Sequence, residues 1–171
     1  MAAALLAGTL FALIPAVPDK ARLLWACGAV LIQLRLLANV LDGMVAVGRG
    51  VASRVGELFN EVPDRISDTA VLAGVGHAVG EPALGWAAAL FAMLTAYVRA
   101  TGRAAGGPSD FRGPMAKQQR MALATALALF CAVTPAEWAH PAGAAVLWVI
   151  AAGSAVTAAR RLAGIAGALR R

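Results

Sequence analysis

The chain consists of six apolar segments separated by short breaks that contain Pro, Gly or charged residues. A helix that crosses a membrane needs about 20 apolar residues, and all segments but the first have roughly that length. The segments lack the alternation of barrel strands, and lipid offers no partner for free backbone groups, so the pattern predicts helices. The predicted helices cover residues 2–17, 21–47, 56–80, 82–102, 115–134 and 142–160.

Composition supports a membrane environment for these helices. Of the 171 residues, 60% are hydrophobic and only 14% are charged, which lies outside the usual range of soluble domains. A soluble core of this size could not bury five or six such segments. The sequence therefore predicts an all-α, polytopic membrane protein in which six transmembrane helices form a single domain over residues 1–171.

The basic residues lie mostly between the apolar segments and predict an orientation. The net charge of +6 would suggest nucleic acid in a soluble protein, but here we expect topology signals, contacts with membrane lipids and no nucleic-acid partner. With six spans, eleven of the fifteen Lys and Arg residues fall on one face, against Lys20 and Arg22 on the other. The positive-inside rule then predicts that both termini are cytoplasmic. We expect the membrane to be a bacterial inner membrane and the basic tail 160–171 to lie at its surface.

Acidic residues gather in one short stretch. Five of the nine acids lie within residues 39–68, namely Asp42, Glu57, Glu61, Asp64 and Asp68. On a helical wheel, Asn60 and the last four of these acids share an arc of roughly 100°, and Asn39 shares a face with Asp42 on the preceding helix. Ionisable groups at membrane depth normally face an interior cavity, so the stretch predicts a polar active-site cavity open to the cytoplasm. The alternative is that the acids merely complement the helix dipole at the start of a helix.

The types of these side chains indicate a metal. Carboxylate and amide oxygens, without Cys or clustered His, suit a hard cation such as Mg²⁺ or Mn²⁺. Arg35 lies seven residues before Asp42 on the same side of its helix. It could pair with Asp42, pair with an acid of the next helix, or reach a lipid phosphate.

The spacing of this stretch resembles the signature of the CDP-alcohol phosphatidyltransferase family, D-x2-D-G-x2-A-R-x8-G-x3-D-x3-D. Every interval is kept, and the motif positions are Asn39, Asp42, Gly43, Ala46, Val47, Gly56, Asn60 and Asp64. A second block agrees. Family members often carry Y-x-R-A followed by G-x3-R-x2-R, and this chain has Tyr97 and Arg99, then Gly113, Lys117 and Arg120 at the same intervals.

The resemblance implies a phosphotransferase of phospholipid biosynthesis. In the family, two divalent metals bind the diphosphate of a CDP-linked lipid, an acceptor alcohol attacks the phosphorus, and CMP leaves. Carried over, Asp64 would be the catalytic base and a metal ligand. Asp42, Gly43, Ala46 and Gly56 would line the nucleotide site, and Arg99, Lys117 and Arg120 would bind a phosphate on the acceptor or lipid. A homodimer is also implied.

Three motif positions depart from the family pattern. Asn39 and Asn60 replace Asp, and Val47 replaces Arg. An amide can still ligate a metal through its oxygen, so the expected ligands are Asn39, Asp42, Asn60 and Asp64, with Glu57, Glu61 or Asp68 restoring some charge. Arg49 or Arg54 could stand in for the lost Arg.

Two other functions stay open at this point. One is a degenerate family member that binds nucleotide or lipid without turnover, and the other is a small transporter that uses the acidic face for cations. The sequence does not identify the acceptor alcohol.

Overall fold

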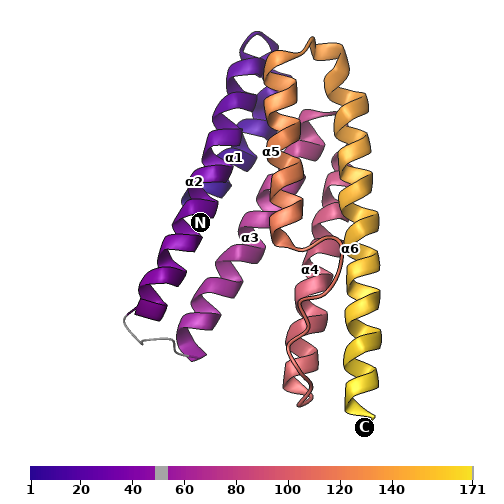
Figure 1. Ribbon diagram of the computed structural model, residues 1–171. Helices are drawn as coiled ribbons and strands as arrows, with labels where there is room; N and C mark the ends of the chain where they lie inside the picture. Colours follow the sequence, from indigo (N-terminus) through magenta and orange to yellow (C-terminus); the bar gives the residue numbers. More distant parts are fainter. Residues whose placement is uncertain (49–53, 171) are drawn as a thin grey trace.

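The computed structural model describes the backbone of residues 1–48 and 54–170 and the side chains of residues 1–44 and 61–170. Figure 1 shows an all-helical bundle, with no strand in these ranges. Its six helices are α1 (Ala2–Leu13), α2 (Ala21–Gly48), α3 (Arg54–Ala78), α4 (Pro82–Ala104), α5 (Lys117–Val133) and α6 (Ala139–Leu169). The predicted all-α fold with six helices is confirmed.

The helix ends follow the proline and glycine positions, with one exception. α1 ends at Leu13, and two short 3₁₀ turns follow instead of continuing it, Ile14–Ala16, which contains Pro15, and Pro18–Lys20. α3 ends before Gly80, which has a φ of 76°, a conformation that favours glycine. The exception is α6, which we expected to end near residue 160 and which continues to Leu169.

Three helical stretches are long and apolar enough to cross a membrane among the residues described: Pro18–Met44, Pro82–Ala104 and Ala136–Leu169. The Ala2–Ala16 stretch is apolar but shorter. α3 does not meet this criterion, and it carries Glu61, Asp64, Arg65 and Asp68. The molecule is therefore a membrane protein whose most polar helix packs among apolar ones.

Small residues allow the helices to approach closely. A Cβ added to Gly76 of α3 would lie 2.7 Å from the Cα of Gly85 on α4, and a Cβ added to Gly74 would lie 2.3 Å from the carbonyl oxygen of Gly8 on α1. Such contacts are typical of helix packing in membranes, where small residues replace the hydrophobic effect as the basis of close association. α3 is thus held between α1 and α4, which fixes the direction of its polar side chains.

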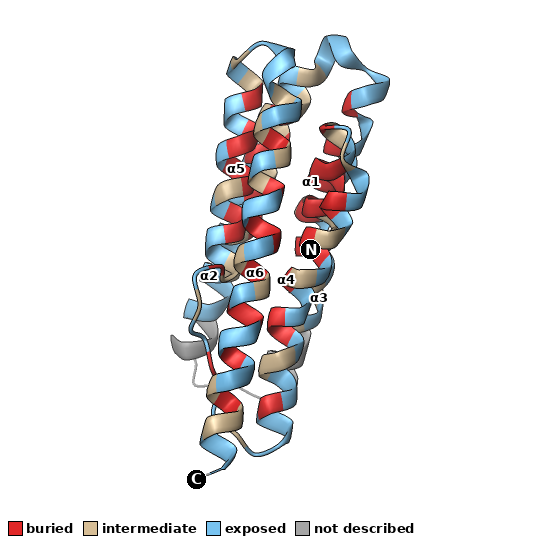
Figure 2. Cartoon of the chain, turned by 90° about the vertical axis from the view of Figure 1, so that its right-hand side faces the viewer, coloured by how far each residue is buried: buried red, intermediate tan, exposed pale blue. Residues whose placement is uncertain are grey.

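The apolar core occupies one half of the bundle. Phe11, Trp25, Leu72 and Leu147 are among the buried side chains there, with the Phe11 and Trp25 rings 4.9 Å apart. In the other half, α1 and α5 are missing because both begin part-way along the bundle, as Figure 1 shows. Figure 2 shows buried residues continuing along α4 and α6 into that half. The segment 105–116 runs back along these helices to reach α5.

Candidate active site

A cavity of about 330 Å³ lies where α5 begins, between α3, α4, α6 and the segment 105–116. Two acidic and five basic side chains line it, together with Phe111 and smaller residues. The charged ones are Glu61, Asp64, Arg65, Arg99, Lys117, Arg120 and Arg161. The excess of fixed cations in a half-enclosed space indicates a binding site for an anion.

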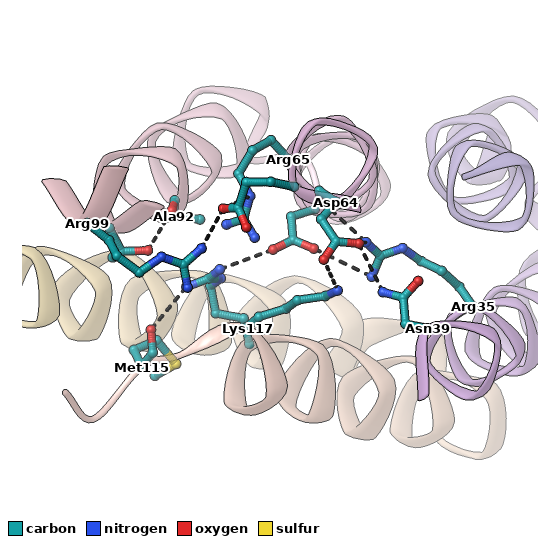
Figure 3. A network of polar contacts seen from close by, with 12 residues as sticks. Arg35, Asn39, Asp64, Arg65, Ala92, Arg99, Met115 and Lys117 are labelled. Carbon is teal, nitrogen blue, oxygen red and sulfur yellow. Dashed lines mark hydrogen bonds and ion pairs between the residues drawn. The ribbon is translucent and has the colours of Figure 1, made fainter. Parts of the chain in front are cut away.

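Asp64 lies at the edge of this cavity and is surrounded by donors (Figure 3). Its Oδ1 accepts hydrogen bonds from Arg35, at 2.7 Å, and from the side-chain amide of Asn39, at 2.9 Å. Its Oδ2 accepts one from the Lys117 ammonium. Three elements, α2, α3 and α5, therefore meet at one carboxylate.

Asp68 lies one turn further along α3 and is buried. Arg120 donates to it at 3.1 Å and also to the carbonyl oxygen of Met115 at 3.0 Å. Arg35 lies on its other side, with 3.7 Å between the charged atoms. Of the alternatives left open for Arg35, pairing with acids of α3 is the one observed.

Glu61 completes the acidic row on α3. Arg99 of α4 donates to it at 2.7 Å, and Arg65 lies 3.4 Å away. The Arg99 guanidinium also lies 4.9 Å from the centre of the Phe111 ring, within range of a cation–π interaction. Glu61 therefore orients the cations that face the cavity.

Arg161 of α6 is a site residue that the sequence analysis missed. We expected it in a surface tail, but only 4% of it is exposed. It donates to the carbonyl oxygens of Thr95, Arg112 and Phe111 at 3.0, 3.0 and 3.2 Å. The prediction of a surface position is wrong for Arg161 because the helix turns this side chain toward the 105–116 segment. In the sequence, the one sign of this burial was the adjacent pair Arg160 and Arg161, whose side chains point in different directions on a helix.

The 105–116 segment has its own ion pair outside the helices. Arg112 donates through its backbone N–H and its guanidinium to Asp110, with a closest distance of 2.7 Å. These bonds lower the pKa of the Asp110 carboxyl below its ordinary value. A Cβ on Gly164 would lie 2.3 Å from the Arg112 guanidinium, so the ion pair rests directly against α6.

Gly113 lets the segment turn toward α5. Its φ is 133°, and a Cβ there would lie 2.4 Å from Thr157 Cγ2. The Thr157 hydroxyl accepts a hydrogen bond from the backbone N–H of Met115 at 3.0 Å. Glycine at this position of the second block therefore has a steric reason.

The structure brings together most of the predicted residues it describes: Asn39, Glu61, Asp64, Asp68, Arg99, Lys117 and Arg120. Asp42 and Gly43 are exposed, one turn beyond Asn39 on α2. A Cβ on Gly43 would meet no atom within 4 Å, so there is open space beside it. The side chains of Ala46, Val47, Arg49, Arg54, Gly56, Glu57 and Asn60 lie outside the described residues.

The oxygen atoms of the site are of the kind that bind hard cations, but most of its carboxylates are already paired with Arg or Lys. Asp42, Asp64 and the amide oxygen of Asn39 are oxygen donors of the kind that Mg²⁺ and Mn²⁺ prefer. Within the described residues, no three acidic, His or Cys side chains converge as a metal cluster. Asp64, Asp68 and Glu61 are each engaged by Arg or Lys. The residues fit a divalent ion, with fixed cations close beside it.

Comparison with known proteins identifies the family. No family model matches the chain. It is 32% identical over 146 residues to the phosphatidylinositol phosphate synthase of Mycobacteroides abscessus, a match that covers 79% of this chain and 63% of that protein. It is 31% identical over 170 residues to the enzyme of the same name from Mycolicibacterium smegmatis, covering 92% of this chain and 73% of that one. The chain belongs to the CDP-alcohol phosphatidyltransferase family.

One further relative agrees with membership of the CDP-alcohol phosphatidyltransferases, and two solved structures share the fold. The archaetidylinositol phosphate synthase of Aeropyrum pernix is 33% identical over 144 residues, which cover 83% of this chain and 71% of that protein. A crystal structure of Mycobacterium tuberculosis phosphatidylinositol phosphate synthase with manganese and citrate superposes with a TM-score of 0.79 at 23% identity. That match covers 96% of this chain and 77% of the other and confirms the fold. The same enzyme with CDP-DAG bound gives a TM-score of 0.73.

Proposed function

We propose that this protein transfers a phosphatidyl group from a CDP-alcohol such as CDP-diacylglycerol to inositol phosphate, with release of CMP. The observation that carries the proposal is the cavity in which Asp64 faces five basic side chains. The names of the relatives support inositol phosphate as acceptor, since two are phosphatidylinositol phosphate synthases. The chain matches 63% of the Mycobacteroides abscessus enzyme, which is less than two thirds of its length. That this protein has the complete activity of its relative is therefore also proposed.

The nucleotide end of the donor would bind beside α2. The family motif places Asp42, Gly43, Ala46 and Gly56 there, and the open space at Gly43 leaves room for a close approach. A Mg²⁺ or Mn²⁺ ion would be held by Asp42 and Asp64, with amide oxygens from Asn39 and Asn60, whereas Glu61 and Asp68 face Arg99 and Arg120. The ion supplies neutralisation of the charge that develops on the diphosphate.

The phosphate of the acceptor would bind in the basic cavity. Arg99, Lys117 and Arg120 face it from α4 and α5, and Arg65 and Arg161 add to the field. Guanidinium groups match phosphate geometry through paired N–H donors. Lys117 can exchange its contact with Asp64 for one with the phosphate, because its ammonium ends a flexible chain.

Asp64 would then act as the base. It removes the proton from the acceptor hydroxyl, whose oxygen forms a bond to the phosphorus next to the lipid. The bond from that phosphorus to the bridging oxygen breaks, and CMP leaves with the electron pair. The cations that surround Asp64 hold it at one position, so that donor and acceptor meet in a fixed geometry.

An apolar groove gives the lipid a path away from this centre. It lies between α2 and α5, has a volume of about 380 Å³, and includes Leu34, Leu37 and Leu129. Leu37 and Asn39 lie within one turn of α2, so one end of the groove is at the same level along the helix as the polar site. We place the polar half of the bundle at the cytoplasmic face of a bacterial inner membrane and expect a homodimer, as the family resemblance implies.

The test is CMP release by the purified chain in lipid nanodiscs with CDP-diacylglycerol and Mg²⁺ or Mn²⁺. We expect release with inositol phosphate, and at least about 100-fold less with inositol, because the basic cavity would be left without its anion. Asp64→Asn should lower the rate by about 10²–10⁴-fold, the usual contribution of a general base. The matched control is Asp19→Asn, an exposed acid in the 3₁₀ turn before α2.

The engagement of Asp64 by Arg35 and Lys117 favours one alternative, a family member that binds without turnover. Nucleotide binding without CMP release, across acceptors that also include glycerol phosphate and serine, would support that alternative. A cation transporter is less compatible with a cavity lined mainly by basic residues.

A further inference from the structure

Arg35 is an almost fully buried charge in an apolar helix. It lies in α2, within the stretch long and apolar enough to cross a membrane, and only 3% of it is exposed. A buried guanidinium at that depth requires anionic partners. Those partners are Asp64, through a 2.7 Å bond to the carboxylate and a 3.4 Å bond to the carbonyl oxygen, and Asp68 at 3.7 Å.

The contacts of Arg35 fill one side of Asp64. Each carboxylate oxygen has two acceptor positions, and Oδ1 of Asp64 already accepts from Arg35 and Asn39. Oδ2 faces Lys117, a flexible side chain that lines the cavity and can move to a bound phosphate. Arg35 has no such freedom, because it is enclosed between α2 and α3. Oδ2 is therefore open to exchange with a metal and Oδ1 is not.

The charges around Asp64 lead to the same result. Two positions where the family carries Asp are neutral in this chain, Asn39 and Asn60. Asp68 and Glu61 are already paired with Arg120 and Arg99. Among the site acids that the structure describes, Asp42 and Asp64 are left for a metal, and together they balance one divalent ion. A second ion would place a further positive charge next to Arg35.

We propose that Arg35 takes, on Asp64, the place of the second divalent ion, so that each chain binds one ion instead of two. This inference rests on the proposed function, since it concerns the metals of that reaction. It assigns Arg35 a positioning role. Its guanidinium holds Asp64 and neutralises part of its charge without touching the substrate.

The experiment counts Mn²⁺ bound to the full chain in detergent, by calorimetry and by the electron paramagnetic resonance signal of free Mn²⁺. The wild type should bind one ion. Two further variants restore the acids of the family motif. One carries Asn39→Asp and Asn60→Asp, and the other carries Arg35→Gln in addition, so that the two differ only at position 35. We expect one ion when Arg35 is kept and two when it is replaced. Arg35→Gln alone should bind its single ion about tenfold more tightly or better, because a positive charge a few ångströms away is removed.

Two ions in the wild type or in the variant that keeps Arg35 would overturn the proposal, as would one ion in both restored variants. The variant that keeps Arg35 gives a result even if replacement of Arg35 prevents folding, and Arg35→Lys, which keeps the charge, should still bind one ion. CMP release measured on the same samples separates the two failures. Activity with two bound ions would sink this inference alone, whereas no ion and no release would sink the proposed function as well.

Discussion

At the scale of residues, the molecule is organised by arginines that are almost fully buried. Arg35, Arg120 and Arg161 are exposed by 3%, 1% and 4%. The first two pair with carboxylates of α3, and the third donates its hydrogen bonds to backbone carbonyl oxygens, with the Asp110 carboxylate also acting on its charge. Burial of a charge is tolerated only when it is paired and hydrogen-bonded. Each arginine therefore ties two or more elements to one another.

Arg161→Gln tests this idea at an arginine whose hydrogen bonds all go to backbone carbonyl oxygens. The change removes donors to the carbonyl oxygens of Thr95, Phe111 and Arg112, and a hydrogen bond from a charged group contributes about 1.5–3 kcal/mol. We expect the free energy of unfolding in detergent to fall by about 2–4 kcal/mol and the KM for the acceptor to rise, because the segment 105–116 loses its anchor.

Arg160→Gln is the matched control for this prediction. Arg160 is the neighbouring residue on α6 but is exposed, so its replacement should change stability by less than about 0.5 kcal/mol. Equal effects of the two substitutions would mean that Arg161 acts through its charge alone and not through the three carbonyl oxygens.

The residue scale also shows where sequence-based prediction ends. Asn39 and Asp64, which are hydrogen-bonded in the structure, could be predicted as neighbours, because the motif spacing and the helical faces follow directly from the sequence. The pairing of Arg35 with acids of α3 could not be predicted from the sequence, which left three possible partners for it. Arg161 was missed because the angle at which α6 faces the 105–116 segment depends on packing between elements that are distant in sequence.

At the scale of elements, the 105–116 segment depends on the ion pair between Asp110 and Arg112. The pKa of Asp110 is lower in the folded protein than its ordinary value of 3.8. Its stabilising effect is therefore complete above about pH 4 and is lost as the pH falls through the lower, folded value. We expect Asp110→Asn to be less stable than the wild type at pH 7, and the difference to shrink toward pH 3.

Thermal unfolding in detergent from pH 7 to pH 3 would measure this difference. Asp19→Asn is the control, because Asp19 is exposed and lies in the turn before α2. A gap between wild type and Asp110→Asn that stays constant over the whole range would show that the carboxylate charge is not what holds the segment.

The crossing of α3 and α4 is the second feature at this scale. A Cβ on Gly76 would meet backbone atoms of α4 at 2.7 Å, which no side-chain rotation can relieve. Gly76→Ala should therefore cost about 1–3 kcal/mol of stability, as overpacking does, and displace the polar row on α3. Gly167→Ala on α6, where a Cβ meets nothing within 4 Å, should be neutral or slightly stabilising. Equal stability of the two variants, from denaturation in the same detergent, would argue against a close crossing.

At the scale of the whole molecule, the two halves of the bundle have different tasks. The half with all six helices holds the apolar core, and the charged site lies where α5 begins, at the border of the half that α1 and α5 do not reach. Hydropathy predicted the helices well because burial in lipid dominates the sequence. It did not predict that α1 and α5 begin part-way along the bundle, which depends on tertiary packing and gives the site its space.

The orientation of the two halves is the last testable point. If the charged half faces the cytoplasm, Ser109, which is exposed in the 105–116 segment, lies inside the cell, and Glu137, exposed at the other end of the bundle, lies outside. Ser109→Cys and Glu137→Cys would each be made with Cys27 and Cys131 replaced by Ala. A maleimide that cannot cross membranes should label the Glu137→Cys variant in intact cells and the Ser109→Cys variant only after permeabilisation. The reverse pattern would put the site on the outer face, where cytoplasmic CDP-linked lipid headgroups could not reach it. The reason for the expected result is the excess of Lys and Arg at the charged end, which favours retention of that end in the cytoplasm.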